Sequence, residues 1–185
     1  MMRKDEIVAA TRNWLEKAVI GLNLCPFARA VYAGDRIRYV VSDATTIEAL
    51  LELLAAELQV LAETDESKTE TTLLIHPQVL GDFLDYNDFL ELADALVADL
   101  DLDGVLQVAS FHPQYQFADT EADDITNCSN RSPYPTLHLL RESSVERAVA
   151  AHPDTERIYR DNIETLRQLG RGGWDRLDVG EPRES

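Results

Sequence analysis

The chain is poor in basic residues, and this scarcity restricts its partners. Lysine and arginine together number 17 against 34 aspartates and glutamates, which gives a formal net charge of −17. A surface this acidic repels phosphate backbones and anionic lipid headgroups. The acidic residues are spread along the solvent faces of the expected helices, which is typical of a surface that favours solubility. We therefore expect neither a nucleic-acid partner nor a membrane partner.

The sequence also lacks long apolar runs and is poor in cysteine. No apolar run approaches the ~20 residues of a membrane span, and the first residues lack the hydrophobic region of a signal peptide, so we expect a cytoplasmic protein. Cys25 and Cys128 are the two cysteines. A disulfide between them is formally open, but in a reducing compartment two thiols are more often buried, catalytic or metal-bound.

Several common enzyme motifs are absent. The chain has no glycine-rich phosphate loop, no Gly-x-Ser-x-Gly nucleophile motif and no kinase signature. Its 185 residues suit one self-sufficient domain. We place this domain at residues 1–173 and expect the polar tail, residues 174–185, to be frayed.

What is present is an alternation of strand and helix patterns. Residues 36–41, 71–75 and 105–111 are short, apolar and rich in β-branched residues, which is typical of strands, and amphipathic helical patterns separate them. This order predicts an α/β fold with a βαβαβ core, a small and mostly parallel sheet, and helices on its faces. Further helical segments are expected at the N- and C-termini. Residues 136–141, TLHLLR, suit a fourth strand, antiparallel at one edge, although a helix is the alternative.

The tripeptide His-Pro-Gln occurs at His76 and again at His112, each time after a predicted strand. Ligands of open parallel sheets bind beyond the carboxyl ends of the strands, so both histidines are candidate site residues. We assign His112 as acid/base, which a carboxylate such as Asp119 or Asp123 would support, and His76 as substrate-binding. The structural alternative is an extended residue before proline whose ring bonds a nearby carbonyl.

The two cysteines are the candidate nucleophiles. Pro26 suits the first position of a short helix, which would leave Cys25 near the helix N-cap, where unpaired amides lower the pKa of a thiol. A histidine beside it would complete a nucleophilic pair. The alternative is a small buried apolar residue. Cys128 lies in a polar segment and is expected to face the crevice.

The long segment that follows the third strand supplies the substrate-binding candidates. Arg131 can hold a carboxylate or phosphate with its planar guanidinium group, and Asn130 beside it favours a turn that presents it. Tyr115 and Tyr134 can line a pocket with an apolar body and a polar tip. Each also has a structural alternative, as a surface arginine or as aromatic anchors of a loop.

Histidine and cysteine together are the ligand types of zinc and iron sites. The spacing gives little support to such a site, because the chain has no Cys-x-x-Cys pair and no His-x-x-x-His pair. We therefore assign no metal ligands, and the sequence leaves the question of a cofactor open.

Three separated motifs carry a family resemblance. GLNLCPFA at residues 21–28, FHPQYQF at residues 111–117 and NRSPYPTLHLLRE at residues 130–142 resemble a family of bacterial proteins known as a domain of unknown function. The resemblance covers nearly the whole chain to about Gly170 and implies no reaction, cofactor or ligand. The candidate residues that it places in characteristic motifs are Cys25, His112, Tyr115 and Arg131.

These observations favour a small cytoplasmic enzyme that acts on an anionic small molecule at the carboxyl edge of the sheet. The alternatives are a metal-binding or ligand-binding module without turnover, and a structural or interaction protein whose motifs hold the long loop in shape. The sequence leaves the reaction, the substrate and the oligomeric state open.

Overall fold

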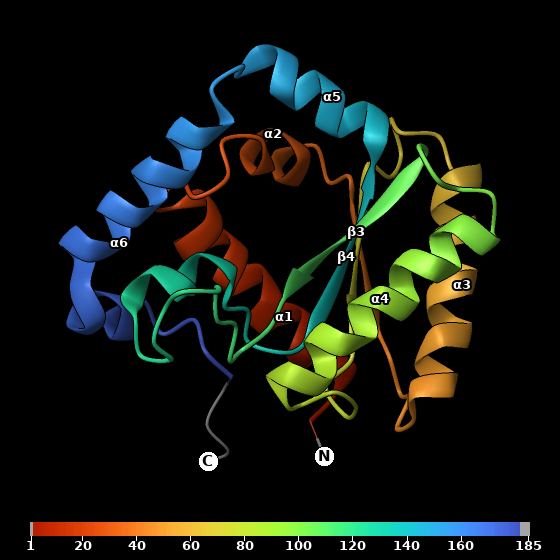
Figure 1. Cartoon of the computed structure of the whole chain (residues 1–185), viewed down its shortest axis with the longest axis horizontal. Helices are drawn as coiled ribbons and strands as arrows, with labels where there is room; N and C mark the ends of the chain where they lie inside the picture. The colour runs from red at the N-terminus through yellow and green to blue at the C-terminus, as the bar shows by residue number, and fades with distance from the viewer. Residues whose placement is uncertain (1, 182–185) are drawn as a thin grey trace.

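The computed structural model describes residues 2–181, and Figure 1 shows a central sheet with helices on both sides. The bounds are α1 (Lys4–Trp14), η1 (Leu15–Ile20), α2 (Ala28–Ala33), β1 (Ile37–Val41), α3 (Ile47–Glu63), β2 (Thr71–Ile75), α4 (Phe83–Asp99), β3 (Leu106–Phe111), η2 (Ile125–Asn130), β4 (Thr136–Arg141), α5 (Glu142–Ala151) and α6 (Thr155–Leu177).

The strands form one mixed sheet in the order β1-β2-β4-β3. β1 pairs in parallel with β2, while β4 pairs antiparallel with both β2 and β3. The first three strands of the chain therefore point in the same direction, and β4 alone among the described strands is reversed. The predicted α/β class, with helices on the faces and at both ends of the chain, is confirmed.

The position of β4 corrects one expectation. Residues 136–141 form an antiparallel strand as predicted, but this strand lies between β2 and β3 instead of at an edge. Leu137 and Leu139 are fully buried, and both sides of the strand are hydrogen-bonded to neighbours. An edge strand leaves one row of backbone groups unpaired and is usually short or charged, whereas a nearly continuous apolar run suits an interior strand.

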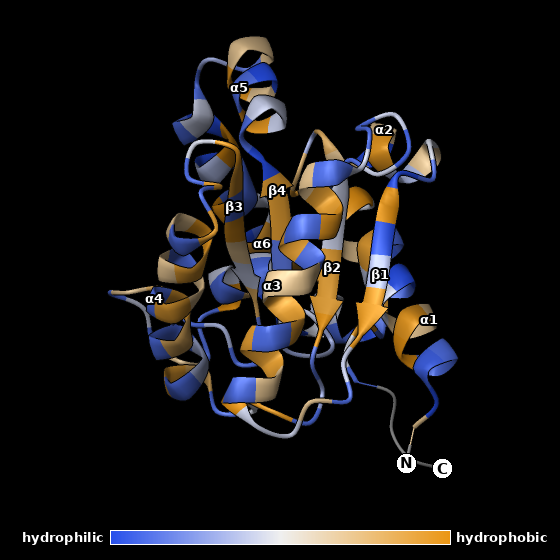
Figure 2. Ribbon diagram, turned by 90° about the vertical axis from the view of Figure 1, so that its right-hand side faces the viewer, coloured by the Kyte–Doolittle hydropathy of each residue, from blue (hydrophilic) through white to orange (hydrophobic). Residues whose placement is uncertain are grey.

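Two helices, α3 and α4, cover one face of the sheet, as Figure 2 shows. Thr46 caps the start of α3 and Asp82 caps the start of α4 with side-chain hydrogen bonds to backbone amides, which fixes where each helix begins. The apolar stripes of both helices pack on alternate residues of the strands. The largest side chains buried there are Leu50, Leu54, Leu58, Leu61, Leu74, Tyr86, Phe89, Leu137 and Leu139.

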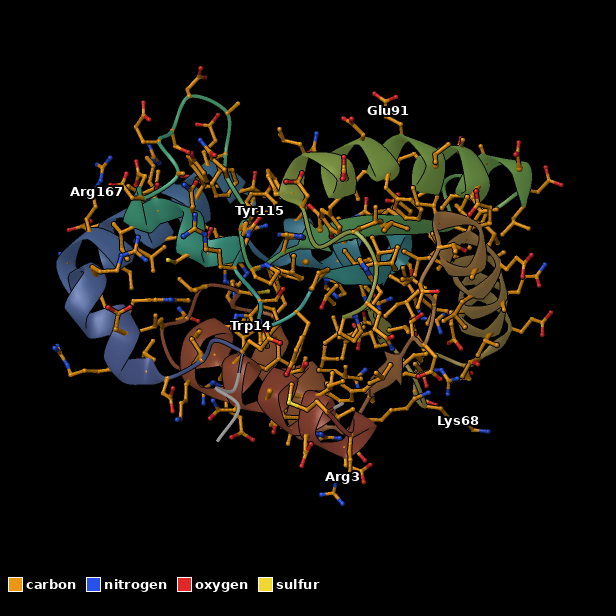
Figure 3. All side chains as sticks on the ribbon, turned by 90° about the horizontal axis from the view of Figure 1, so that it is seen from below. Arg3, Trp14, Lys68, Glu91, Tyr115 and Arg167 are labelled. Carbon is orange, nitrogen blue, oxygen red and sulfur yellow. The ribbon has the colours of Figure 1, made fainter. Side chains whose placement is uncertain are left out.

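The opposite face is covered by α1, η1, α2, α5 and α6. Trp14 is fully buried and meets the ring of Phe111 edge-on at a centroid distance of 5.0 Å, and Figure 3 shows it between α1 and the sheet. The predicted N-terminal helix changes to π-helical hydrogen bonding at Leu15. By contrast, α5 has no buried residue. On this face α1 therefore packs tightly against the sheet, whereas α5 packs loosely.

The C-terminal helix corrects the predicted start of a frayed tail at residue 174. α6 bends at Gly170, where φ is 66°, and continues to Leu177. Beyond it, the carbonyl of Asp178 accepts a hydrogen bond from the Asn13 side chain at 2.9 Å, and Val179 is buried against the α1 side of the molecule. Residues 182–185 of the predicted tail lie outside the described residues.

Candidate functional site

A cavity of about 370 Å³ lies between the sheet and its loosely packed helical cover. Strand residues form its floor, while η1, the segment before α2, and α5 form its walls. Its volume is at the lower end of the range of about 300–1,000 Å³ that small-molecule pockets occupy. The residues that line it are Leu15, Val19, Cys25, Phe27, Ala28, Val31, Ile37, Glu70, Thr71, Leu73, Phe111, His138, Leu140, Ser144, Val145, Ala148, Val149 and Thr155.

His138 is a polar residue of the cavity floor. It lies in the interior strand β4, opposite Leu73 on β2 and Ala109 on β3. Burial lowers the pKa of its imidazole to about 4, so the ring is uncharged at neutral pH. Within residues 2–181 neither ring nitrogen has a hydrogen-bond partner, and the accessible part of the side chain faces the cavity. A neutral imidazole offers one donor and one acceptor, and here both are free.

Sequence reasoning missed His138, although a signal was present. The alternation in TLHLLR places Leu137 and Leu139 on one face of the strand and His138 and Leu140 on the other. A histidine within an otherwise apolar interior strand is a polar group that must find a partner or a ligand. This signal becomes specific once the strand is known to be interior.

The structure places Cys25 in this cavity and places the helix that follows it two residues later than the predicted start at Pro26. α2 begins at Ala28 with Phe27 as its N-cap, so the segment around Pro26 is a turn that precedes the helix. Cys25 is a free, partly buried thiol on the cavity wall. It therefore shares the cavity with His138, not with the histidines predicted from the strand ends.

His112 lies at the predicted edge of the sheet but is engaged by the backbone on both nitrogens. Its Nε2 donates to the carbonyl of Leu80 at 3.0 Å, and its Nδ1 accepts from the N–H of Gln114 at 3.0 Å. Burial lowers its pKa, which keeps the ring neutral in this arrangement. The side chain is fully buried. This geometry gives no support to an acid/base role, which stays a prediction.

His76 occupies the equivalent position after β2. Its Nδ1 donates to the carbonyl of Val79 at 2.9 Å, while its Nε2 is buried without a partner among the described residues. Burial lowers the pKa of this ring to about 4. Its ring stacks on Tyr86 at a centroid distance of 5.7 Å, and His112 meets the same tyrosine at 4.9 Å. The two histidines are thus brought together, in a buried cluster.

The guanidinium group of Arg131, predicted to bind an anion, is already hydrogen-bonded to backbone carbonyls of its own loop. Arg131 donates from Nε to the carbonyl of Tyr115 at 3.1 Å and from Nη2 to the carbonyl of Ala122 at 2.6 Å. Asn130 donates to the carbonyl of Ser110 at 3.3 Å. The ring of Tyr115 packs against other aromatic rings of the buried cluster. These side chains hold residues 112–131 in shape, which corresponds to the structural alternative for the loop.

Cys128 and Tyr134 are both buried. Cys128 lies beneath α6, where the Arg171 guanidinium donates to its Sγ at 3.9 Å, and burial raises the pKa of its thiol. Cys128 therefore does not face a crevice as we expected, and the raised pKa disfavours a thiolate nucleophile. Tyr134 donates its hydroxyl to the Met2 sulfur at 3.5 Å, and burial raises its pKa to about 12. Neither residue reaches Cys25 or His138 in the cavity lining.

The ligand chemistry of the cavity is mainly apolar. Among residues 2–181, no group of three or more His, Cys, Asp or Glu side chains is placed to hold a metal ion. The described residues that line the cavity include no lysine or arginine. The arrangement can therefore bury an apolar molecule and give it hydrogen bonds from one neutral imidazole, with a thiol nearby.

Comparison with known proteins identifies a family but no activity. No helix within residues 2–181 is both long enough and apolar enough to cross a bilayer. No curated protein and no solved structure matches the chain. A family model does match, over residues 6–176, and its description is a protein of unknown function, DUF1415. Because the match covers most of the chain, this protein belongs to the DUF1415 family.

Proposed function

We propose that this protein binds a small, largely apolar and uncharged molecule in the cavity between the sheet and η1, α2 and α5. The observation that supports this most is His138, a polar side chain without a partner in a mainly apolar floor. His138 is only partly buried, so its ring nitrogens are accessible from the cavity. A ligand with a hydroxyl, amide or amine group can bond the ring, while its apolar body fills the cavity and leaves water.

The charge of the cavity favours an uncharged ligand over the anionic molecule that the sequence suggested. Glu70 is the charged residue of the lining, and it pairs with Arg36 and lies 4.0 Å from Arg147. A ligand carboxylate or phosphate would have to leave water without a counter-charge in the lining, which is costly. An uncharged polar group avoids this desolvation cost.

A second candidate function is an enzyme in which Cys25 is the nucleophile. The observation that favours it is that Cys25 and His138 line the same cavity. A neutral imidazole can accept the proton of a thiol, as in Cys-His catalysis, and a thiolate beside it would oppose the burial that lowers the pKa of His138. If His138 activates the thiol, native Cys25 reacts with iodoacetamide faster than a model thiol, and His138→Leu removes the acceleration. A rate equal to that of the model thiol in both proteins would eliminate this candidate.

Binding can be tested with N-phenyl-1-naphthylamine, an uncharged aromatic probe with one N–H donor whose fluorescence increases in apolar surroundings. The native protein should show saturable fluorescence with one site per chain. Ala148→Phe places a large ring into the cavity from α5 and should abolish the signal. Ala150→Phe is the matched control, because Ala150 is exposed on the same helix and does not line the cavity.

The two variants separate cavity binding from surface adsorption. If Ala150→Phe and Ala148→Phe bind the probe equally well, the probe is on the surface and the proposal is wrong. Circular dichroism and urea denaturation of both variants establish that each one is folded. A native protein that gives no saturable signal at micromolar probe concentrations also contradicts the proposal.

A further inference from the structure

A second, polar cleft of about 450 Å³ lies beside the apolar cavity. It is formed by the turn before α2 and by the junction between α5 and α6. His152, Arg157 and Asn162 are among its polar residues. Asn162 is already engaged, since its side-chain amide donates to the carbonyl of Leu24 at 2.9 Å. Within residues 2–181, the imidazole of His152 has no hydrogen-bond partner, so its polar atoms face the cleft.

Residues adjacent in the sequence line the cavity and the cleft alternately. Cys25 and Phe27 line the apolar cavity, whereas Pro26 lines the cleft. At the other side Asp154 lines the cleft and Thr155 lines the cavity. A wall in which consecutive residues face opposite sides is one residue thick. The two spaces therefore adjoin along this segment.

One aromatic contact closes the boundary between them. The rings of Phe27 and His152 meet edge-on, with centroids 5.0 Å apart and planes at 87°. Phe27 belongs to the cavity lining and His152 to the cleft lining. Such a pair contributes only about 0.5–1.5 kcal/mol. Because His152 is exposed and follows the loosely packed α5, little opposes a rotation that would break this contact.

The charged groups that line the cleft, Asp154, Asp161 and Arg157, are already in ion pairs, one of them with Arg160 outside the lining. Asp161 lies 3.7 Å from the Arg157 guanidinium, and Asp154 lies 3.5 Å from that of Arg160. Two carboxylates thus meet two guanidinium groups, and all four side chains are more than half exposed. Because each charged group of the lining is already paired, the cleft offers its remaining hydrogen-bond donors and acceptors to an uncharged polar group.

We infer that the ligand of this protein is amphipathic: its apolar body lies in the cavity above His138, and an uncharged, hydrogen-bonding head group lies in the cleft beside His152 and Arg157. This inference rests on the proposed function and specifies its ligand class. The apolar part supplies affinity by leaving water. The head group adds hydrogen bonds to Arg157 and His152 and stays partly in solvent.

The test compares molecules that share an eight-carbon chain and differ in the head group. Octanol, octyl glucoside, octanoate and octylammonium are titrated below their micellar concentrations as competitors of N-phenyl-1-naphthylamine on the full-length protein. Octyl glucoside should compete with a Kd about tenfold lower than octanol, which corresponds to about 1.4 kcal/mol of added hydrogen bonding. Octanoate and octylammonium should each be weaker than octyl glucoside.

Two matched variants locate the head group. Ala151→Trp blocks the cleft and should weaken octyl glucoside to the level of octanol, while N-phenyl-1-naphthylamine binding stays unchanged. Ala150→Trp makes the same change at an exposed neighbour outside both linings and should leave every affinity unchanged. If octyl glucoside competes no better than octanol, or if octanoate is the strongest competitor, the amphipathic inference is wrong while cavity binding stands. If the native protein does not bind N-phenyl-1-naphthylamine at all, both proposals fail.

Discussion

The imidazole of His112 donates a hydrogen bond to the carbonyl of Leu80 at 3.0 Å, and this bond ties β3 to the segment before α4. Leu80 is buried and has a φ of 60°, a left-handed conformation that a branched side chain rarely adopts. The neighbouring carbonyl of Val79 accepts from His76 in the same way. The two His-Pro-Gln copies therefore hold one unusual backbone turn.

Replacing His112 should cost stability. His112→Ala removes two hydrogen bonds and the ring contacts with Phe83 and Tyr86, so the free energy of unfolding should fall by roughly 2–4 kcal/mol. Glu91→Ala, at an exposed site on α4, is the control and should change it by less than about 0.5 kcal/mol. Urea denaturation measures both. An unchanged or higher stability of His112→Ala would instead favour the catalytic role that the sequence suggested, since catalytic residues often compromise stability.

Replacing His138 should have the opposite effect on the ligand-free protein. His138→Leu exchanges a partly buried imidazole without a protein partner for an apolar side chain of similar size, so stability should increase by up to about 1 kcal/mol. The same change should weaken binding of N-phenyl-1-naphthylamine about tenfold, because its N–H loses an acceptor. Urea denaturation and fluorescence titration give the two values. A destabilised variant with unchanged affinity would argue that His138 serves the fold.

The folded protein should lose stability on mild acidification. Burial lowers the pKa of His76 and His138 from 6.5 to about 4 and also lowers that of His112. Between pH about 6.5 and 4 the unfolded chain binds more protons at these rings than the folded chain, so falling pH favours unfolding. The loss across this window should be on the order of a few kcal/mol.

The change in net charge with pH provides a control for the histidine effect. The net charge of −17 becomes smaller on acidification, which reduces repulsion and would by itself stabilise the folded state. A decline in the urea midpoint between pH 7 and pH 5 therefore identifies the histidines, and His138→Leu should show a shallower decline than the native protein. A midpoint that rises over this range would contradict the prediction.

The two thiols should differ in their reaction with an uncharged reagent. Cys25 lines the cavity, whereas Cys128 is fully buried and its pKa is raised by burial. N-ethylmaleimide should label Cys25 first in the native protein, and saturating N-phenyl-1-naphthylamine should slow that labelling severalfold. Peptide mass spectrometry distinguishes the sites. Equal labelling of both cysteines, or no protection by the probe, would show that Cys25 does not report on the cavity.

Helix α5 should be the most mobile part of the cavity wall. None of its residues is buried, and its ion pair between Arg147 and Glu66 is exposed on both sides, a type of contact worth about 0–1 kcal/mol. Amide hydrogen exchange should therefore be faster in Glu142–Ala151 than in α3 or α4. Saturating probe should slow it. Exchange in α5 as slow as in α3 without a ligand would contradict this expectation.

Local patterns predicted most of the elements but not their arrangement. Residues 71–75 were assigned correctly as β2, because His76-Pro77 ends the strand and Thr71 begins it. The edge position of β4 was wrong, since pairing partners are set by packing between segments far apart in the sequence. The predicted helix start at Pro26 is two residues too early, because Pro26 and Phe27 form a turn and α2 begins at Ala28.

The candidate site was harder to predict than the fold. The sequence favours the reactive side chains of the long loop as site residues, yet Arg131 and His112 bond to nearby backbone carbonyls. His138 looked like an ordinary strand residue, and its importance depends on an empty volume formed by helices distant in the sequence. Sequence patterns report which side chains are polar, whereas unfilled space arises only from the assembled tertiary structure.

The interior position of β4 in the sheet also affects how the chain can fold during synthesis. β3 has β4 as its neighbour in the sheet and does not touch β2, so β3 has no strand partner until residues 136–141 leave the ribosome. Until then the nascent polypeptide exposes one unpaired edge of β2 and the edges of β3. Unpaired strand edges are sites where a chaperone can bind or another chain can pair incorrectly. A fragment that stops before Thr136 would lack the strand that joins β1-β2 to β3. The smallest piece able to fold alone should therefore extend at least through Arg141.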